Sequence, residues 1–179
     1  HRRQLRELFA TLTKHGLVIN LAKCQFGRKE LDFLGHHVSH RGITPLAHKV
    51  EAVRNFPQPS NAKQLTEFLG MFNFYHRFVP HAAQTLQPLH QALAWKAKSF
   101  VWTDSMTGAF REAKEALAAA TLLIHPKESA PLALTVDASS IAVGAVLEQQ
   151  VKGQWQPLGF FSRQLRAPET RYSAFDREL

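Results

Sequence analysis

The sequence predicts a mixed fold of the α+β or α/β class with more than one domain. Apolar residues recur at helical spacing through most of residues 1–120, whereas from Pro131 onward they alternate as they do in strands. The charge changes along the chain in the same way: residues 1–100 hold 14 Lys and Arg against 5 Asp and Glu, and residues 101–179 hold 8 against 9. We therefore place the main boundary between residues 95 and 130.

The composition is typical of a soluble globular protein. Of the 179 residues, 45% are hydrophobic and 20% are charged. No apolar run approaches the roughly 20 residues that span a membrane, and the basic start of the chain lacks the pattern of a signal peptide. Cys24 is the only cysteine, which excludes a disulfide framework. We expect an intracellular protein, in a cytoplasmic particle or the nucleus and not secreted, whose net charge of +8 suits a polyanionic partner.

The first predicted elements are a helix and a hairpin. An amphipathic helix over residues 2–15, ending at Gly16, is predicted from a stripe at helical spacing. That stripe consists of Leu5, Leu8, Phe9 and Leu12. The segment "ELDFLGHHVS" is the clearest strand of a hairpin that turns at Arg41-Gly42, and Pro45 then opens a second helix that the breaker "FPQP" closes.

The next helix begins with a capping-box pattern, because Asn61 is followed three residues later by Gln64. It carries a stripe that we expect in the core: Leu65, Phe68, Leu69, Phe72 and Tyr75. Pro80 ends this region, and a further helix interrupted by Pro88 runs to about Ala94. The segment "SFVW" that follows is interpreted as a short strand or an anchor.

The last third begins with a helix and then changes to strands. Thr103 caps an Ala-rich helix, "DSMTGAFREAKEALAAA". Strands are predicted over residues 131–137, 141–149 and 154–162. Ser173 caps a final helix, and Asp176 is interpreted as its capping-box partner.

Asp137 is the most informative single residue. It stands at the carboxyl end of a strand, "PLALTV", that we expect to be buried, with Val136 facing the core and Asp137 on the opposite face. Burying an unpaired carboxylate costs several kcal/mol, so a compensating cation is one explanation. The helix-borne Glu178 could share that divalent cation. The alternative is that Asp137 caps a turn and Glu178 is solvated, and the spacing leaves both open.

Several long motifs carry a family resemblance. The stretch from "LFATLTKHGLVINLAKCQF" to "FNFYHRFVP" resembles reverse transcriptases of gypsy-type LTR retrotransposons, from just after the polymerase YxDD segment through the thumb. The segments "FVWTDSMTGAFREAKEAL", "LTVDASSIAVGAVLEQ", "PLGFFSRQL" and "RYSAFDREL" resemble the ribonuclease H domain of the same Pol polyproteins. The motifs follow the family's order over essentially the whole chain.

The resemblance implies an architecture. Residues 1–44 would be the end of the palm with a hairpin like the primer grip, and residues 45–94 the helical thumb. Residues 95–130 would form a linker and helix. Residues 131–179 would form the N-terminal part of a ribonuclease H-like mixed sheet.

The resemblance also implies site residues. Those expected to contact nucleic acid are Phe33, Leu34 and Gly35 in the hairpin, Tyr75, His76 and Arg77 in the thumb, and Ser162 and Arg163 in the "SR" motif. The alternative for the thumb is that its aromatic residues, Tyr75 among them, lie in the core and that only Arg77 and His76 are exposed. His76 departs from the family's "YYRRF" pattern, which removes one fixed charge. Asp137 and Glu178 match two catalytic carboxylates that, in the complete ribonuclease H site, bind two Mg²⁺ ions, for which Mn²⁺ can substitute.

Some catalytic residues of the family have no counterpart in this chain, which limits the activity that we expect. The polymerase aspartates would precede His1, and two further ribonuclease H aspartates would follow Leu179. The resemblance therefore implies an RNA-directed DNA polymerase and ribonuclease H as the full protein, and an inactive fragment. The implied partners are RNA–DNA hybrid, RNA template, DNA primer and the other Pol segments, with no membrane, while dimerisation of the full protein stays open. Two alternatives remain: a non-enzymatic remnant that binds hybrid or RNA, and a structural protein with neither activity.

Overall fold

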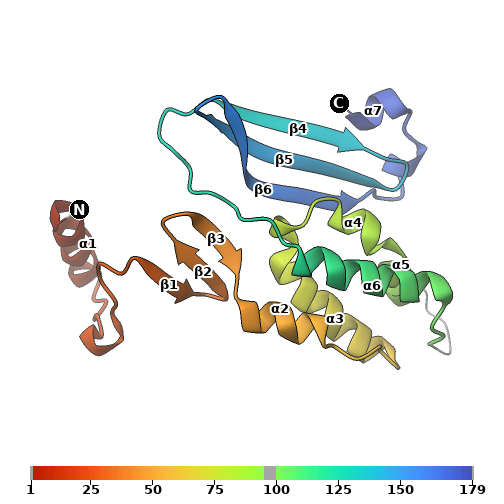
Figure 1. Cartoon of the computed structure of the whole chain (residues 1–179), viewed down its shortest axis with the longest axis horizontal. Helices are drawn as coiled ribbons and strands as arrows, with labels where there is room; N and C mark the ends of the chain where they lie inside the picture. The colour runs from red at the N-terminus through yellow and green to blue at the C-terminus, as the bar shows by residue number, and fades with distance from the viewer. Residues whose placement is uncertain (1, 95–99, 179) are drawn as a thin grey trace.

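The computed structural model describes the backbone of residues 2–94 and 100–178 (Figure 1). The helices are α1 (Arg2–Lys14), α2 (Ala47–Arg54), α3 (Ala62–Tyr75), α4 (Ala82–Thr85), α5 (Gln87–Ala94), α6 (Asp104–Ala118) and α7 (Ala174–Glu178). Short 3₁₀ helices are η1 (Leu21–Lys23), η2 (His76–Phe78) and η3 (Glu169–Arg171). The strands are β1 (Glu30–Phe33), β2 (His36–Ser39), β3 (Gly42–Pro45), β4 (Leu132–Ala138), β5 (Ala142–Val151) and β6 (Gln154–Gln164).

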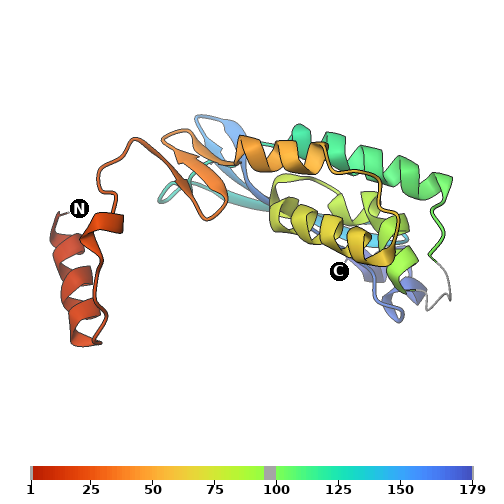
Figure 2. The ribbon, with the colours of Figure 1, turned by 90° about the horizontal axis from the view of Figure 1, so that it is seen from below.

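The amphipathic helix α1 stands apart from the rest of the molecule (Figure 2). None of its residues is buried, and Leu8 is 50% exposed. Its apolar stripe reaches the following segment through Phe9, whose ring centroid lies 6.0 Å from that of Phe26. The predicted helix is therefore confirmed, but it does not join the main core.

The first sheet is a three-stranded antiparallel meander in the order β1-β2-β3. The predicted turn at Arg41-Gly42 joins β2 to β3. The prediction of one strand over "ELDFLGHHVS" is wrong, because Leu34 (φ +47°) and Gly35 (φ +82°) turn the chain between β1 and β2. Pro45 ends β3 instead of opening the helix, and α2 begins at Ala47.

The core lies among the helices that follow. Every residue of the predicted α3 stripe is buried: Leu65, Phe68, Leu69, Phe72 and Tyr75. The side chain of Asn61 accepts a hydrogen bond from Gln64 N (3.0 Å), as a helix cap does. Gln64 Oε1 in turn accepts from Ser60 N (2.8 Å) instead of from Asn61 N, so the capping box is displaced by one residue.

Helix α6 shares this core. Thr103 Oγ1 accepts from Met106 N (3.3 Å), which confirms the predicted cap. The ring of Phe110 in α6 packs 4.6 Å from Phe68 in α3, and Trp102 packs against Phe110 at 5.8 Å. Residues 100–102 of the segment "SFVW" thus anchor the chain to the core and form no strand, whereas Ser99 lies outside the described residues. The domain boundaries stay a prediction, but α6 packs with α2, α3 and α5.

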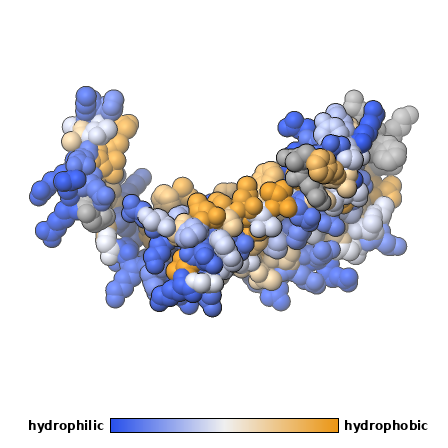
Figure 3. Space-filling model, turned by 90° about the horizontal axis from the view of Figure 1, so that it is seen from above, coloured by the Kyte–Doolittle hydropathy of each residue, from blue (hydrophilic) through white to orange (hydrophobic). Residues whose placement is uncertain are grey.

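The second sheet is antiparallel in the order β4-β5-β6 and lies over η2 and α4 (Figure 1). The three predicted strands are confirmed. The expectation that "PLALTV" is buried is wrong: Leu132, Leu134 and Val136 are 63%, 65% and 52% exposed. Within the described residues, no helix covers this face of β4 except at its end, where α7 packs. Hydrophobic side chains accordingly gather in the middle of the upper side of the molecule (Figure 3).

Candidate nucleic-acid interface and carboxylate pair

The turn between β1 and β2 is clamped onto helix α3. Tyr75 Oη donates a hydrogen bond to the carbonyl of Gly35 (3.0 Å). The ring of His36 stacks on Phe74 with centroids 5.3 Å apart. A Cβ added to Gly35 would lie 2.8 Å from the Phe74 ring, in a backbone conformation that favours glycine. The turn therefore favours glycine at position 35, and a side chain there would also displace the Phe74 ring.

This clamp creates an exposed apolar surface, which we call the tip surface and define as Phe33, Leu34 and Phe74. These side chains are 57%, 73% and 52% exposed. Phe33 and Leu34 were expected here from the resemblance, whereas Phe74 was missed. The signal in the sequence was its position: Phe74 lies off the buried α3 stripe and so must face outward. Exposed aromatic rings beside a glycine turn provide stacking and close backbone approach for a base or sugar.

The three thumb residues have different environments. Tyr75 is only 4% exposed, and burial raises the pKa of its hydroxyl, so the expectation that it contacts nucleic acid is corrected: it fixes the hairpin from the core. His76 Nδ1 donates to Asn73 O (2.6 Å), which leaves Nε2 directed elsewhere. Arg77 is exposed, with its guanidinium 5.6 Å from the Phe78 ring centroid. Arg77 is the fixed positive charge of this segment.

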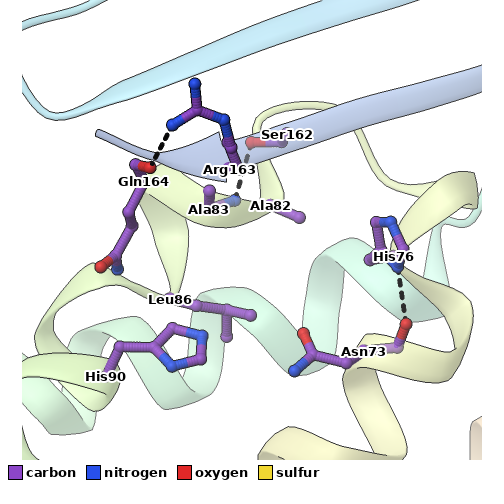
Figure 4. Close-up of a pocket in the computed structure, with 9 residues that line it drawn as sticks. All are labelled: Asn73, His76, Ala82, Ala83, Leu86, His90, Ser162, Arg163 and Gln164. Carbon is purple, nitrogen blue, oxygen red and sulfur yellow. Dashed lines mark hydrogen bonds between the residues drawn. The ribbon is translucent and has the colours of Figure 1, made fainter. Parts of the chain in front are cut away.

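His76, Ser162 and Arg163, which lie far apart in the sequence, line one pocket of about 570 Å³ between β6 and helices α3 to α5 (Figure 4). Ser162 Oγ accepts from Ala83 N (2.9 Å), and this bond ties β6 to α4. His90, on another wall, is partly buried, and this desolvation lowers its pKa. The described lining combines apolar side chains of Ala and Leu with imidazole, amide, hydroxyl and guanidinium groups, and it contains no acid.

Arg163 is engaged with Glu169 of the neighbouring η3. Its Nη1 and Nη2 atoms donate to the two Glu169 carboxylate oxygens at 2.6 and 3.0 Å. Arg166 N donates to the same carboxylate at 2.7 Å. These hydrogen bonds, that from the Arg163 side chain first, lower the pKa of Glu169 to about 2. The described contacts of Ser162 and Arg163 are thus internal and hold the end of β6 in place.

Asp137 lies near the end of β4, opposite Gly144 of β5. It is exposed, so the expected burial of its carboxylate is wrong, and the energetic argument for a compensating cation no longer applies. It borders a pocket of about 210 Å³ that β4, β5 and β6 form with Pro80 and His81. A Cβ added to Gly144 would lie 3.8 Å from His81 Nδ1, so the imidazole of His81 lies close to this part of the strand pair.

Helix α7, which contains Glu178, lies against the same end of β4. Arg177 Nη1 donates to Ser139 O (2.8 Å), just past the end of that strand. Ser173 caps this helix as predicted, since Asp176 N donates to Ser173 Oγ (3.2 Å); Asp176 Oδ2 accepts from the Ser173 hydroxyl (2.6 Å) instead of from its backbone N–H, so the pair differs from the expected capping box. The tertiary structure therefore places the backbone of Glu178 beside the strand end of Asp137. The side chain of Glu178 is outside the described part.

The described residues contain neither a three-residue metal cluster nor a helix that could span a membrane. Among the described side chains, which do not include that of Glu178, no three His, Cys, Asp or Glu gather where they could hold a metal ion. No helix in that same part of the chain combines the length and the apolar character needed to cross a membrane. Metal binding at Asp137 thus needs ligands besides the described side chains.

Comparisons with known proteins agree with this arrangement. Residues 102–179 match the family described as the RNase H-like domain found in reverse transcriptase. The whole chain aligns over 180 residues, at 33% identity, with the Transposon Tf2-3 and Tf2-4 polyproteins of Schizosaccharomyces pombe. The chain spans 13% of the length of these relatives.

Solved structures show the same fold. A foamy viral protease-reverse transcriptase dRH in complex with double-stranded DNA is similar over 98% of this chain and 31% of that one, with a TM-score of 0.77 and 25% identity. A foamy viral protease-reverse transcriptase in complex with RNA/DNA hybrid is similar over 99% of this chain and 24% of that one, with a TM-score of 0.77. Its 24% identity supports the fold alone.

Proposed function

The chain is a segment of the reverse transcriptase–ribonuclease H region of a gypsy-type retrotransposon polyprotein, and we propose that it forms part of an enzyme with RNA-directed DNA polymerase and ribonuclease H activities. In that enzyme, the tip surface and Arg77 would hold an RNA–DNA hybrid formed from an RNA template and a DNA primer. The β4–β6 sheet would present the carboxylates that take part in hydrolysis of the RNA strand.

The observation that carries the ribonuclease proposal is the position of α7. The Arg177–Ser139 bond holds this helix against the strand end where Asp137 stands. This position of α7 supports the proposal that the strand-end Asp137 and the helix-borne Glu178, 41 positions apart in the sequence, act together. Hard carboxylate oxygens are the ligands that Mg²⁺ prefers.

Asp137 and Glu178 are the residues that we propose as metal ligands, for Mg²⁺ or, as a substitute, Mn²⁺. Their oxygens fit a hard cation, and Asp137 borders a pocket of about 210 Å³. Two such ions, in the complete site, would activate water and stabilise the leaving oxygen of a phosphodiester. We further propose that this segment alone is inactive, because the remaining carboxylates of the complete site would come from other parts of the polyprotein.

The nucleic-acid contacts follow from charge and exposure. The first 100 residues carry an excess of 9 positive charges, as 14 basic against 5 acidic residues give. Arg77 on this basic part, next to the aromatic tip surface, suits a phosphate backbone whose bases or sugars pack on rings. The remaining polyprotein segments are the partners that we propose for the polymerase and metal chemistry.

The test uses the full reverse transcriptase that carries this segment, a labelled RNA–DNA hybrid and Mg²⁺ or Mn²⁺. We expect binding that weakens steeply with salt and cleavage that Asp137→Asn abolishes without loss of binding. The matched control is Asp104→Asn, which removes an exposed carboxylate at the start of α6, far along the sequence from Asp137.

The outcomes separate the alternatives. Cleavage by the 179-residue chain alone would refute the proposed inactivity of the segment. Salt-dependent binding without cleavage by the full protein would leave the non-enzymatic, hybrid-binding remnant. If neither binding nor cleavage is found, only a structural role remains.

A further inference from the structure

The segment between α6 and β4 connects the first sheet to the second. We call residues 121–127 the strap. Leu123 pairs with Ile43 of β3 through two backbone hydrogen bonds, Ile43 N to Leu123 O (2.7 Å) and Leu123 N to Ile43 O (3.0 Å). Leu123 itself is 1% exposed and belongs to the core. The strap therefore acts as a short fourth strand beside β3.

Gly42 makes this approach possible. A Cβ at this position would lie 2.2 Å from Leu123 O, and the atom in the way is backbone, so rotation of a side chain cannot relieve the overlap. The φ of Gly42 is +144°, in the region that side chains disfavour. Glycine at position 42 thus allows both the turn and the close approach of the strap.

The other side of the strap is bound to the second sheet. Ile124 N donates to Pro157 O of β6 (3.1 Å). Gln149 of β5 is 1% exposed and uses both ends of its amide: Nε2 donates to His125 O (2.9 Å), and Oε1 accepts from Lys127 N (2.8 Å). A buried polar group whose partners are all in place specifies one geometry, because any displacement leaves it unpaired.

His125 completes a direct link between the two sheets. Its carbonyl binds Gln149, and its ring Nε2 lies 2.6 Å from Ser39 O of β2. Since a carbonyl only accepts, Nε2 carries the proton. A continuous path of hydrogen bonds thus runs from the hairpin, through the strap, to the strand that pairs with the strand of Asp137.

We propose that Gln149 and His125 are positioning residues that fix the spacing between the tip surface and Asp137. This inference rests on the proposed function, because the tip surface would hold the primer end and Asp137 would lie where RNA is cut. The strap then determines how far from the primer end cleavage occurs. Neither residue touches the hybrid or the reacting atoms in this scheme.

The experiment measures cut positions in the full enzyme. The substrate is an RNA–DNA hybrid with a recessed, labelled DNA 3′ end, and RNA cuts are mapped to the nucleotide. We expect Gln149→Leu to raise the ratio of displaced to normal cuts about 30-fold, the scale of two lost buried hydrogen bonds. Total cleavage should stay unchanged, which a merely destabilised enzyme would not show. The control is Gln150→Leu, the same change at the next position, where the described side chain has no bond to the strap.

A second pair of variants guards against misfolding. His125 is exposed, so His125→Leu removes the link to Ser39 without altering the core. We expect the same displacement of cuts, and His125→Gln should restore the normal pattern because its amide can donate to that carbonyl. Unchanged cut positions in both Gln149→Leu and His125→Leu would overturn the inference.

If the wild-type enzyme does not cleave the hybrid, the proposed function is refuted. The structural link between the two sheets through Gln149 and His125 can then still be tested by hydrogen exchange. In the same proteins, Gln149→Leu should then raise exchange at the Ile43 and Leu123 amides relative to Gln150→Leu. Equal exchange in the two variants would overturn the structural inference as well.

Discussion

The replacement Gly42→Ala tests the pairing of β3 with the strap most directly. The new Cβ would meet Leu123 O at 2.2 Å, and the φ of +144° is one that alanine disfavours. Such backbone strain costs about 1–3 kcal/mol. Separating the two strands to relieve the overlap breaks the two hydrogen bonds with Ile43, at about 1 kcal/mol each. We therefore expect Gly42→Ala to lower the free energy of unfolding by about 3–5 kcal/mol.

The assay is denaturant unfolding of the purified chain, followed by far-UV circular dichroism. The matched control is Gly27→Ala: Gly27 also has positive φ (+63°), but a Cβ there meets nothing within 4 Å. Gly27→Ala should cost only about 1–2 kcal/mol, the penalty of the left-handed conformation. Equal losses in the two variants would refute the argument that contact with Leu123, and not φ alone, makes Gly42 necessary.

Three further predictions concern the hairpin, the end of β6 and the outer face of β4. Tyr75→Phe removes the hydrogen bond to Gly35 O and should lower the unfolding free energy by about 1 kcal/mol, measured by thermal unfolding. It should also weaken hybrid binding in a titration. Unchanged values in both measurements would contradict the clamp. Glu169 has a pKa of about 2, below the ordinary 4.5, because Arg163 stabilises its charged form, so the unfolded chain binds the proton first. The Arg163–Glu169 pair therefore stabilises the fold fully above pH 4.5, and this stabilisation is lost as the pH falls toward 2. Glu169→Gln should make the unfolding free energy less dependent on pH between these values. The same pH dependence in the variant and the wild type would count against the pair. Leu134→Ser should change the unfolding free energy of this chain by less than about 0.5 kcal/mol, because Leu134 is 65% exposed, whereas a loss typical of a core leucine would show that the face is covered.

The local elements follow from the sequence because their causes are local. A helix of period 3.6 with apolar residues at matching positions can bury only one stripe, and α3 buries the stripe that the spacing predicts. The caps at Asn61, Thr103 and Ser173 bind backbone groups within three residues. The break of β1 from β2 at Leu34-Gly35 was missed as a strand boundary, because apolar residues continue on both sides of the turn.

The candidate site depended partly on sequence and partly on tertiary structure. Asp137 was singled out from the strand pattern and matched to a family motif, and the hairpin residues were found through the motifs, whereas the exposed Phe74, which lies off the buried stripe of α3, was missed. Tyr75 was assigned to nucleic acid by motif but lies in the core, where its hydroxyl reaches a carbonyl 40 positions away. Motifs identify which residues a family uses, but they do not show which side of a helix meets the ligand.

The sequence by itself determined the order and type of most elements, the buried stripe of α3 and the family, since these depend on periodicity and short motifs. Only the tertiary structure decided that the apolar face of β4 is exposed, because alternation tells which residues share a face and not what covers it. It alone showed that the strap joins β3 to β6 and that Ser162 binds Ala83, 79 positions away. Such contacts form when distant segments meet in the folded chain, and no local pattern encodes them.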